Sequence, residues 1–267
     1  MTSPQQSPAA ASDETDARRQ LQIQKMESMC TMSAGIAHDM NNYLAAILGN
    51  NTVMQRSPSL DTRAKECGQR IESAGNLALH LSEQLATYSA RIEHNPVELD
   101  LQELVDAVRT ATSGILSRGI GLDFEIAPNC PPLYADPAQL QRVLVNLITN
   151  AIESMVDRQG VIHVFLRPYQ PAPSDADLSF FSLLTDGAWF ELAVKDAGHG
   201  IPLKFRDRIF DPFFSTKIRG RRMGLPETLG IVRLHNGNII VKSQPGAGTT
   251  LRILLPVPPD AALGATD

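Results

Sequence analysis

Apolar side chains recur at three- and four-residue steps from Ala17 to about Gln55, and no proline interrupts that segment. The spacing is typical of a helix with one apolar side. At 1.5 Å per residue such a helix would be roughly 55–60 Å long, and it could not bury its apolar side alone. The residues of this first apolar stripe are Met29, Met32, Ile36, Met40, Tyr43 and Ile47.

A second long helix is expected from about residue 62 to residue 93, after the break SPSLD. Pro58 ends the first helix, and Asp61 is in place to cap the second. Two long helices joined by a short turn form an antiparallel hairpin. The apolar stripe of the second helix consists of Ile71, Ala74, Leu77, Leu81, Leu85 and Tyr88.

Both apolar stripes need a partner surface. The simplest closed solution is a homodimer, in which two hairpins form a four-helix bundle. The alternative is a monomeric hairpin that packs on the domain following it in the chain.

Helical and strand patterns alternate after HNPVELD, which is expected to be a linker with a short strand. This order predicts an α+β chain whose second half is an α/β sandwich, with one mixed sheet against helices. The proline-rich stretch PYQPAPSDADLSFFSLLTDG is expected to be a surface loop with a helical turn. The predicted helices are residues 101–117, 136–155 and 227–234, and the predicted strands are 121–126, 161–167, 189–195, 238–242 and 250–255.

These patterns divide the chain into four parts. Residues 1–16 and 257–267 lack periodicity and are expected to be disordered tails. Residues 17–95 would form the helical hairpin, and residues 96–256 the sandwich.

Composition narrows the function classes. Lys and Arg number 24 against 29 Asp and Glu, so the net charge of -5 gives no basic field for nucleic acid. Cys30, Cys67 and Cys130 form no CxxC pair, which argues against a metal site and fits a reducing cytoplasm. No window approaches the ~20 apolar residues of a bilayer span, and no signal-peptide core is present. We expect a cytoplasmic protein without direct membrane insertion, to which an upstream sensor protein or domain brings any membrane signal.

The first candidate for chemistry is His38, in the segment AGIAHDMNN of the first helix. It is two residues from both Ile36 and Met40, which places it roughly opposite the apolar stripe and predicts that it faces water. Asp39 is adjacent, and Asn42 is one turn away, where its carboxamide could orient a water or a phosphoryl oxygen. A lone exposed histidine usually has no task, but an exposed imidazole beside a carboxylate is a competent nucleophile toward phosphorus.

The second candidate is the helix LQRVLVNLITNAIESM. Asn146 and Asn150 are four residues apart and share one face of an otherwise apolar helix. Buried amides without partners would be costly. Two interpretations are open: a pair of surface amides, or a polar wall that offers neutral oxygen atoms to a ligand with phosphates or magnesium.

Two glycine-containing segments follow. In VKDAGHGIP, the carboxylate of Asp196 can accept a hydrogen bond from an amine, and Gly198 and Gly200 let the backbone pass close to a planar ring. A short Gly-x-Gly is by itself a weak signal. In RIFDPFFSTKIRGRRMGLPETLGIV, an aromatic corner leads into a basic loop and a helix start, which favours phosphate. The basic residues of that loop are Lys217, Arg219, Arg221 and Arg222.

In this order the segments resemble the histidine kinases of bacterial two-component signalling, from about residue 20 to residue 256. AGIAHDMNNYLAAILGN resembles the H box, with His38 as phospho-acceptor and Asp39 and Asn42 as catalytic neighbours. NLITNAIESM resembles the N box, and DAGHGIP the first glycine box. IFDPFFSTK resembles the F box, and MGLPETLGIVRLHNGNIIVKSQPGAGTTLRILLP the second glycine box with the terminal strands.

The resemblance implies a dimeric helical-hairpin bundle followed by the Bergerat-type ATP-binding sandwich shared with gyrase, Hsp90 and MutL. It also implies ATP and Mg²⁺ as cofactors, with Asn150 as the magnesium ligand and Asp196 as the contact to the adenine amine. The expected nucleotide-binding residues are Asn146, Asn150, Asp196, Gly198, Gly200, Lys217, Gly220, Gly224, Leu225 and Thr249.

The ATP lid departs from the family's usual Gly-x-Gly-x-Gly-Leu-Gly-Leu. After STK this chain has the shorter IRGRRMGL, in which only Gly220 and Gly224 can be matched. Pro226 and Glu227 stand where small residues are usual, and Ala197 stands where the family often has Asn, Asp or Thr. Fewer glycine N–H groups predict weaker contact with the triphosphate.

The expected function is an ATP-dependent protein histidine kinase. It would autophosphorylate on His38 and pass the phosphoryl group to an aspartate in the receiver domain of a separate response regulator. It would also be that regulator's phosphatase if Asn42 positions a water. The alternative is a nucleotide-deficient phosphotransfer or scaffold dimer with a degenerate lid. A hydrolytic ATPase is disfavoured, because such enzymes place a glutamate where Asn146 stands.

Overall fold

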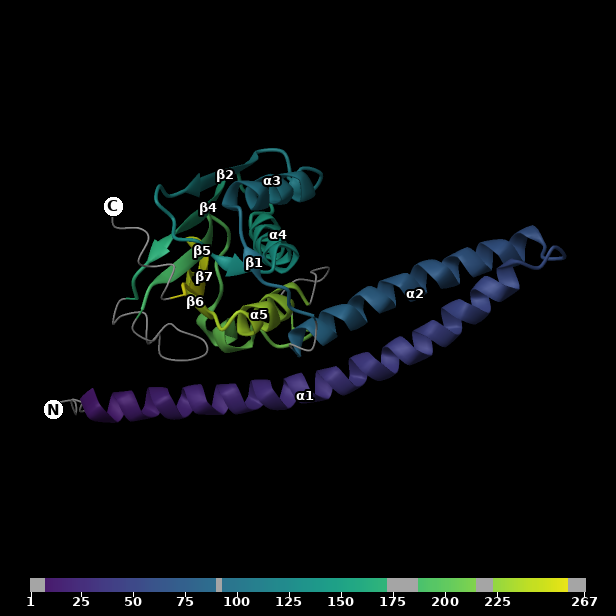
Figure 1. The fold of residues 1–267 in the computed structure, drawn as a ribbon, viewed down its shortest axis with the longest axis horizontal. Coiled ribbons are helices and arrows are strands. Elements are labelled where there is room, and N and C mark those ends of the chain that lie inside the picture. The colour runs from purple at the N-terminus through teal and green to yellow at the C-terminus, as the bar shows by residue number, and fades with distance from the viewer. Residues whose placement is uncertain (1–7, 90–92, 172–186, 215–222, 259–267) are drawn as a thin grey trace. The chain divides into compact units, whose positions relative to one another are not determined.

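The computed structural model describes residues 8–89, 93–171, 187–214 and 223–258 (Figure 1). Residues 27–92 form one compact unit, and the rest of the chain forms the other. No helix in these described ranges combines the length and the apolar character needed to cross a membrane.

The first unit is a helical hairpin, made from part of α1 (Pro8–Gln55) and α2 (Thr62–Tyr88). Asp61 caps α2 as expected, because its carboxylate accepts a hydrogen bond from the backbone N–H of Ala64 at 2.7 Å. α1 begins earlier than residue 17, since an alanine-rich stretch follows Pro8 and proline is tolerated in the first helical turn. α2 ends at Tyr88, before the predicted residue 93.

Small and polar residues form the seam between the two helices. Gly75 lies so close to Leu48 that a Cβ atom there would come within 2.5 Å of the Leu48 side chain. The hydroxyl of Ser82 donates to the carbonyl of Ala37 at 2.8 Å, and the amide of Asn51 donates to the carbonyl of Gly68 at 3.0 Å. The two backbones therefore approach closely at these points.

The predicted apolar stripe of α1 does not lie in this seam. Met32 is 66% exposed, Tyr43 is 70% exposed, and Ile36 and Ile47 are also exposed. In α2 the stripe is divided, because Leu77 is exposed whereas Leu85 is buried. A single hairpin consequently leaves a row of large apolar side chains in water, an arrangement that indicates a partner surface.

The second unit contains a five-stranded mixed sheet in the order β2-β4-β5-β7-β6. The pair β2 and β4 is parallel, and the other neighbouring pairs are antiparallel. The helices α3, α4 and α5 lie on one side of the sheet (Figure 1). The strands are β2 (Ile120–Ile126), β4 (Gly160–Tyr169), β5 (Trp189–Asp196), β6 (Asn238–Gln244) and β7 (Gly248–Pro256), and the helices are α3 (Leu101–Thr112), α4 (Pro137–Ser154) and α5 (Gly224–Leu234).

The sequence patterns predicted these elements within a few residues, apart from α3, which is five residues shorter than expected. The short strand β1 (Val97–Glu98) is where the linker pattern placed it, and it pairs with β3 (Tyr134–Ala135), which was not predicted. A 3₁₀ helix at Leu203–Arg208 was also not predicted. Most of the predicted proline-rich loop lies outside the described residues.

Helix α4 forms the centre of this unit. Asp136 caps it by accepting from the backbone N–H of Gln139 at 3.1 Å, and Pro137 is its first residue. It contacts α3, α5 and three strands. Its fully or almost fully buried side chains are Leu140, Val143, Leu144, Leu147 and Ile148.

A buried histidine joins α5 to the start of α4. Nε2 of His235 accepts from the backbone N–H of Asp136 at 3.1 Å, so Nδ1 carries the proton and donates to the carbonyl of Ile231 at 2.9 Å. The ring of His94 packs edge-on against it, with ring centroids 4.4 Å apart. Burial lowers the pKa of His235, and the nearby His94 lowers it further, against the opposing effects of the Ile231 hydrogen bond and of Asp136.

This arrangement predicts an acid-dependent loss of stability. An unfolded histidine takes up a proton below about pH 6.5, whereas folded His235 resists protonation. The free energy of unfolding should therefore fall as the pH decreases from about 7.5 to about 5.5, with a contribution of up to about 1.4 kcal/mol per pH unit from this residue. Urea unfolding at both pH values should give a smaller difference for His235→Gln than for the wild-type chain. An equal difference would exclude His235 as the source.

Candidate functional sites

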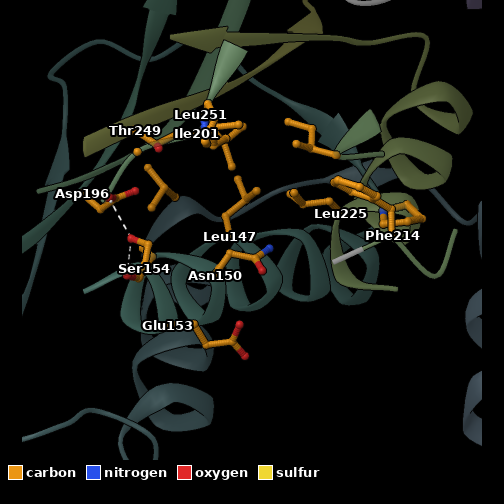
Figure 2. A pocket seen from close by; sticks show the side chains of 16 residues that line it. Leu147, Asn150, Glu153, Ser154, Asp196, Ile201, Phe214, Leu225, Thr249 and Leu251 are labelled. Carbon is orange, nitrogen blue, oxygen red and sulfur yellow. Dashed lines mark hydrogen bonds between the residues drawn. The ribbon is translucent and has the colours of Figure 1, made fainter. Parts of the chain in front are cut away.

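A cavity of about 140 Å³ lies between α4, the end of β5, the start of β7 and the first turn of α5 (Figure 2). Figure 2 shows Asp196 and Ser154 facing each other on one side of it, and Phe214 and Leu225 on the other. The antiparallel register of β5 and β7 places Asp196 beside Thr249. The apolar residues that line the cavity include Leu147, Val194, Ile201, Ile209, Leu225 and Leu251.

The carboxylate of Asp196 is held in one orientation at the polar side of this cavity. The residue is only 8% exposed. Its Oδ1 accepts from the hydroxyl of Ser154 at 2.9 Å and from the backbone N–H of Gly198 at 2.7 Å. A fixed carboxylate next to apolar walls suits a flat, mostly apolar ring that carries an amine.

The glycines around Asp196 leave no room for side chains. A Cβ on Gly198 would lie 1.9 Å from the Ser154 hydroxyl oxygen, and one on Gly200, where φ is +71°, would lie 2.1 Å from the carbonyl oxygen of Gln244. Gly248 has φ +102° and would place a Cβ 2.1 Å from the Asp196 carbonyl oxygen. The backbone at these positions approaches its neighbours more closely than any other residue type allows.

Two side-chain contacts attach the loop after Asp196 to the end of α4. The guanidinium of Arg158 donates to the carbonyls of Ala197 and Gly198 at 2.9 and 3.0 Å and to that of Gly246 at 3.1 Å. The ring Nδ1 of His199 lies 2.7 Å from the carbonyl oxygen of Ser154. These hydrogen bonds therefore hold the loop that follows Asp196 in place beside the cavity.

Asn150 lines the cavity from α4, and its side-chain nitrogen is buried without a hydrogen-bond partner among the described residues. Burying an amide N–H group without a hydrogen-bond partner costs free energy, unless a bound ligand accepts the hydrogen bond. Glu153, one turn further along α4, lies on the same cavity. These oxygen-bearing side chains suit Mg²⁺, which typically binds one or two protein groups together with substrate phosphates. In the part of the chain described, no cluster of three or more His, Cys, Asp or Glu residues could hold a metal by itself.

Asn146, the other predicted amide, does not line the cavity. Its side-chain nitrogen donates to Oε2 of Glu227 at 3.0 Å, and the other oxygen of Glu227 forms an ion pair with Arg142. Gly224 begins α5 next to Asn146, and Leu225 reaches the cavity.

Of three further predicted binding residues, one lies in the described part of the chain and two lie outside it. Thr249 lines the cavity, with its hydroxyl 2.9 Å from the hydroxyl of Ser243. Lys217 and Gly220 lie outside the described residues, so the shortened lid stays a prediction.

The predicted phospho-acceptor group lies in the hairpin unit. The side chain of His38 is 75% exposed, as its position opposite the stripe predicted. Its Nδ1 lies 3.3 Å from Oδ1 of Asp39, and the amide nitrogen of Asn42 lies 3.5 Å from the same ring atom. The structure thus brings together all three predicted catalytic residues on a solvent-facing stretch of α1.

Comparison with known proteins agrees with this geometry. Residues 135–259 match the family of histidine kinase-, DNA gyrase B- and HSP90-like ATPases. The sensor kinase CckA of Brucella abortus is 31% identical over 237 residues, which are 88% of this chain and 25% of CckA. The sensor histidine kinase ZraS of Escherichia coli is 30% identical over 237 residues, or 88% of this chain and 47% of ZraS.

The chain belongs to the histidine kinase family. It spans between a quarter and half of the length of these two histidine kinases.

Solved histidine kinase structures share the fold. Full-length ShkA in complex with AMPPNP superposes with a TM-score of 0.62 at 21% identity, covering 85% of this chain and 45% of ShkA. The histidine kinase ThkA in complex with the response regulator TrrA gives a TM-score of 0.53 at 20% identity, covering 96% of this chain and 69% of ThkA.

The sequence analysis did not identify several residues that line this cavity or hold its walls in place. Ser154 follows Asn146 and Asn150 at the same four-residue spacing, so the polar face of α4 could have been extended to it. Arg158 gave no such signal, because Ala197 is 39 residues away in sequence. Glu227 stood out only as a departure from the usual small residues, since its partner Asn146 is 81 residues away.

The glycine contacts predict a difference between two neighbouring substitutions. Gly246 and Gly248 both have positive φ, but a Cβ on Gly246 would meet nothing within 4 Å. Gly248→Ala should therefore destabilise the chain by about 1–3 kcal/mol more than Gly246→Ala, because only the former also overlaps a backbone oxygen. Urea unfolding of both variants measures the difference. Equal losses would show that backbone conformation alone requires glycine at residue 248.

Proposed function

We propose that the chain is an ATP-dependent protein kinase that phosphorylates its own His38 and transfers the phosphoryl group to an aspartate of a response regulator. The observation that carries the proposal is the fixed carboxylate of Asp196 beside an apolar cavity, within the segment that matches the ATPase family. The complex of the similarly folded ShkA with AMPPNP supports nucleotide binding.

Asp196 and the cavity walls would bind the adenine end of ATP. The exocyclic amine of adenine would donate to the carboxylate, and the apolar side chains of Leu147 and Leu251 would contact the ring. Asn150 would hold Mg²⁺ through its amide oxygen at the phosphate end. The ion would supply charge neutralisation for the phosphates.

His38 would be the nucleophile. With Nδ1–H donating to Asp39, the lone pair of Nε2 is available to attack the γ-phosphorus of ATP. A nitrogen–phosphorus bond forms, the bond from phosphorus to the bridging oxygen breaks, and ADP leaves with that electron pair. Asp39 stabilises the positive charge that develops on the ring, because its carboxylate lies 3.3 Å from Nδ1.

The partners follow from the same arrangement. The receiver domain of a response regulator would take the phosphoryl group, which the complex of ThkA with TrrA supports. A second copy of the chain would cover the exposed apolar stripe of α1 in a homodimer. We also propose that Asn42 positions a water for dephosphorylation of the regulator, that an upstream sensor protein or domain supplies the signal, and that the protein acts in the cytoplasm.

The central experiment is phosphorylation of the wild-type chain with labelled ATP and Mg²⁺. We expect one acid-labile, alkali-stable phosphoramidate. His38→Gln should abolish the label without loss of stability, because the side chain is exposed. His80→Gln is the matched control, since His80 is an exposed histidine of α2 that also has a glutamate nearby, and it should be labelled like the wild type. Undiminished label in His38→Gln would contradict the assignment.

The nucleotide site is tested separately by calorimetry. Asp196→Asn should weaken ATP and ADP binding alike, by about tenfold or more, because both ligands share the adenine amine and lose a hydrogen bond to a charged group. Asp123→Asn, at an exposed carboxylate on β2, should leave both affinities unchanged. Unchanged affinity in Asp196→Asn would place adenine elsewhere, and absence of ATP binding in the wild type would favour a scaffold function.

A further inference from the structure

Glu227 is a carboxylate buried between two helices of the nucleotide-binding unit. It lies in the first turn of α5 and is only 2% exposed. Two of its side-chain contacts reach α4: Oε2 accepts from the amide nitrogen of Asn146 at 3.0 Å, and Oε1 forms an ion pair with the partly exposed Arg142. A buried charge of this kind persists only where partners compensate its loss of hydration.

The contact with Glu227 fixes the side chain of Asn146. Because the amide nitrogen donates to a carboxylate, the amide cannot rotate by half a turn without facing oxygen toward oxygen. Asn146 is one turn before Asn150 on the same face of α4, and Asn150 lines the cavity. Glu227 therefore sets the orientation of the amide next to the one proposed to bind magnesium.

The same carboxylate holds the start of α5 against α4. Leu225 and Pro226, which directly precede Glu227, both line the cavity. The backbone N–H of Glu227 donates to the carbonyl of Met223 at 2.8 Å, which ties the turn together at that point. A shift of the Glu227 side chain would move two cavity-lining residues together with Asn146.

We propose that Glu227 is a positioning residue for the phosphate and magnesium end of the nucleotide site, acting through Asn146 and the first turn of α5. This inference rests on the proposed function, because it assigns a role within the same ATP site. It concerns the phosphate end alone, and the adenine contact of Asp196 lies outside its reach.

The test compares ATP affinity of the full chain in Mg²⁺ and in EDTA, measured by calorimetry. The magnesium-dependent gain is the ratio of the ATP affinity in Mg²⁺ to that in EDTA. Glu227→Leu should reduce this gain about tenfold, while the ATP affinity in EDTA should change less than about twofold. Glu227→Gln should retain part of the gain, because its amide oxygen can still accept from Asn146. An equal and full loss in both variants would overturn the Asn146 route.

A matched control separates positioning from stability. Glu191 is another fully buried carboxylate of this unit, paired with Arg167 and Arg252, and it does not line the cavity. Glu191→Gln and Glu227→Gln should both lower the thermal unfolding midpoint, but Glu191→Gln should keep the full magnesium-dependent gain in ATP affinity. If Glu191→Gln also lost the magnesium-dependent gain in ATP affinity, the effect of Glu227 would be one on stability alone, and the proposal would be overturned.

A double variant tests the route through Asn146. Asn146→Ala combined with Glu227→Leu should lose no more of the magnesium-dependent gain than the larger single effect. Additive losses would overturn the proposal. A wild-type chain that binds ATP equally well in Mg²⁺ and in EDTA would overturn the role of Glu227 alone, whereas a wild-type chain that binds no ATP would overturn the proposed function and this inference with it.

Discussion

Burial of the apolar face of α4 is the constraint on which the second unit, with its five-stranded sheet and its cavity, depends. Leu144, Leu147 and Ile148 are almost fully buried in a helix that contacts the sheet, so the rotation of the helix about its axis is fixed. Fixing that rotation also fixes where the polar residues of the helix lie. Asn150 and Ser154 then reach the cavity, and Ser154 meets Asp196 from β5. One packing requirement thereby determines the chemistry available to a ligand.

This dependence explains why much of the fold and part of the site could be read from the sequence. The α4 pattern combines a capping Asp136, a proline at the first position and an apolar spacing, all local signals that agree with one another. His38 was placed correctly in water for the same reason, since helical spacing relates it directly to Ile36 and Met40. Local periodicity is sufficient wherever the deciding contact lies on one element.

The remaining features depend on partners that are distant in sequence. Nothing near Glu227 indicates that its carboxylate meets Asn146, 81 residues earlier. Arg158 likewise joins carbonyls of two separate loops, which only the folded chain brings together. In the hairpin, spacing identified the apolar stripe of α1, but the close approach of Gly75 to Leu48 decides that small residues form the seam and that the stripe faces away from it. Periodicity identifies the apolar face of α1, but side-chain packing decides which face of α1 contacts α2.

The two neighbours of His38 place opposite demands on one ring atom. Asp39 can bond Nδ1 only when that nitrogen carries a proton, whereas the amide of Asn42 can donate to Nδ1 only when it does not. In a neutral ring the first arrangement leaves Nε2 with its lone pair, and the second puts the proton on Nε2 and removes its nucleophilicity. The competition between a carboxylate and an amide for Nδ1 is thus a choice of tautomer, so moving one proton between Nδ1 and Nε2 through the surrounding water would switch the proposed nucleophile on or off without any change in net charge.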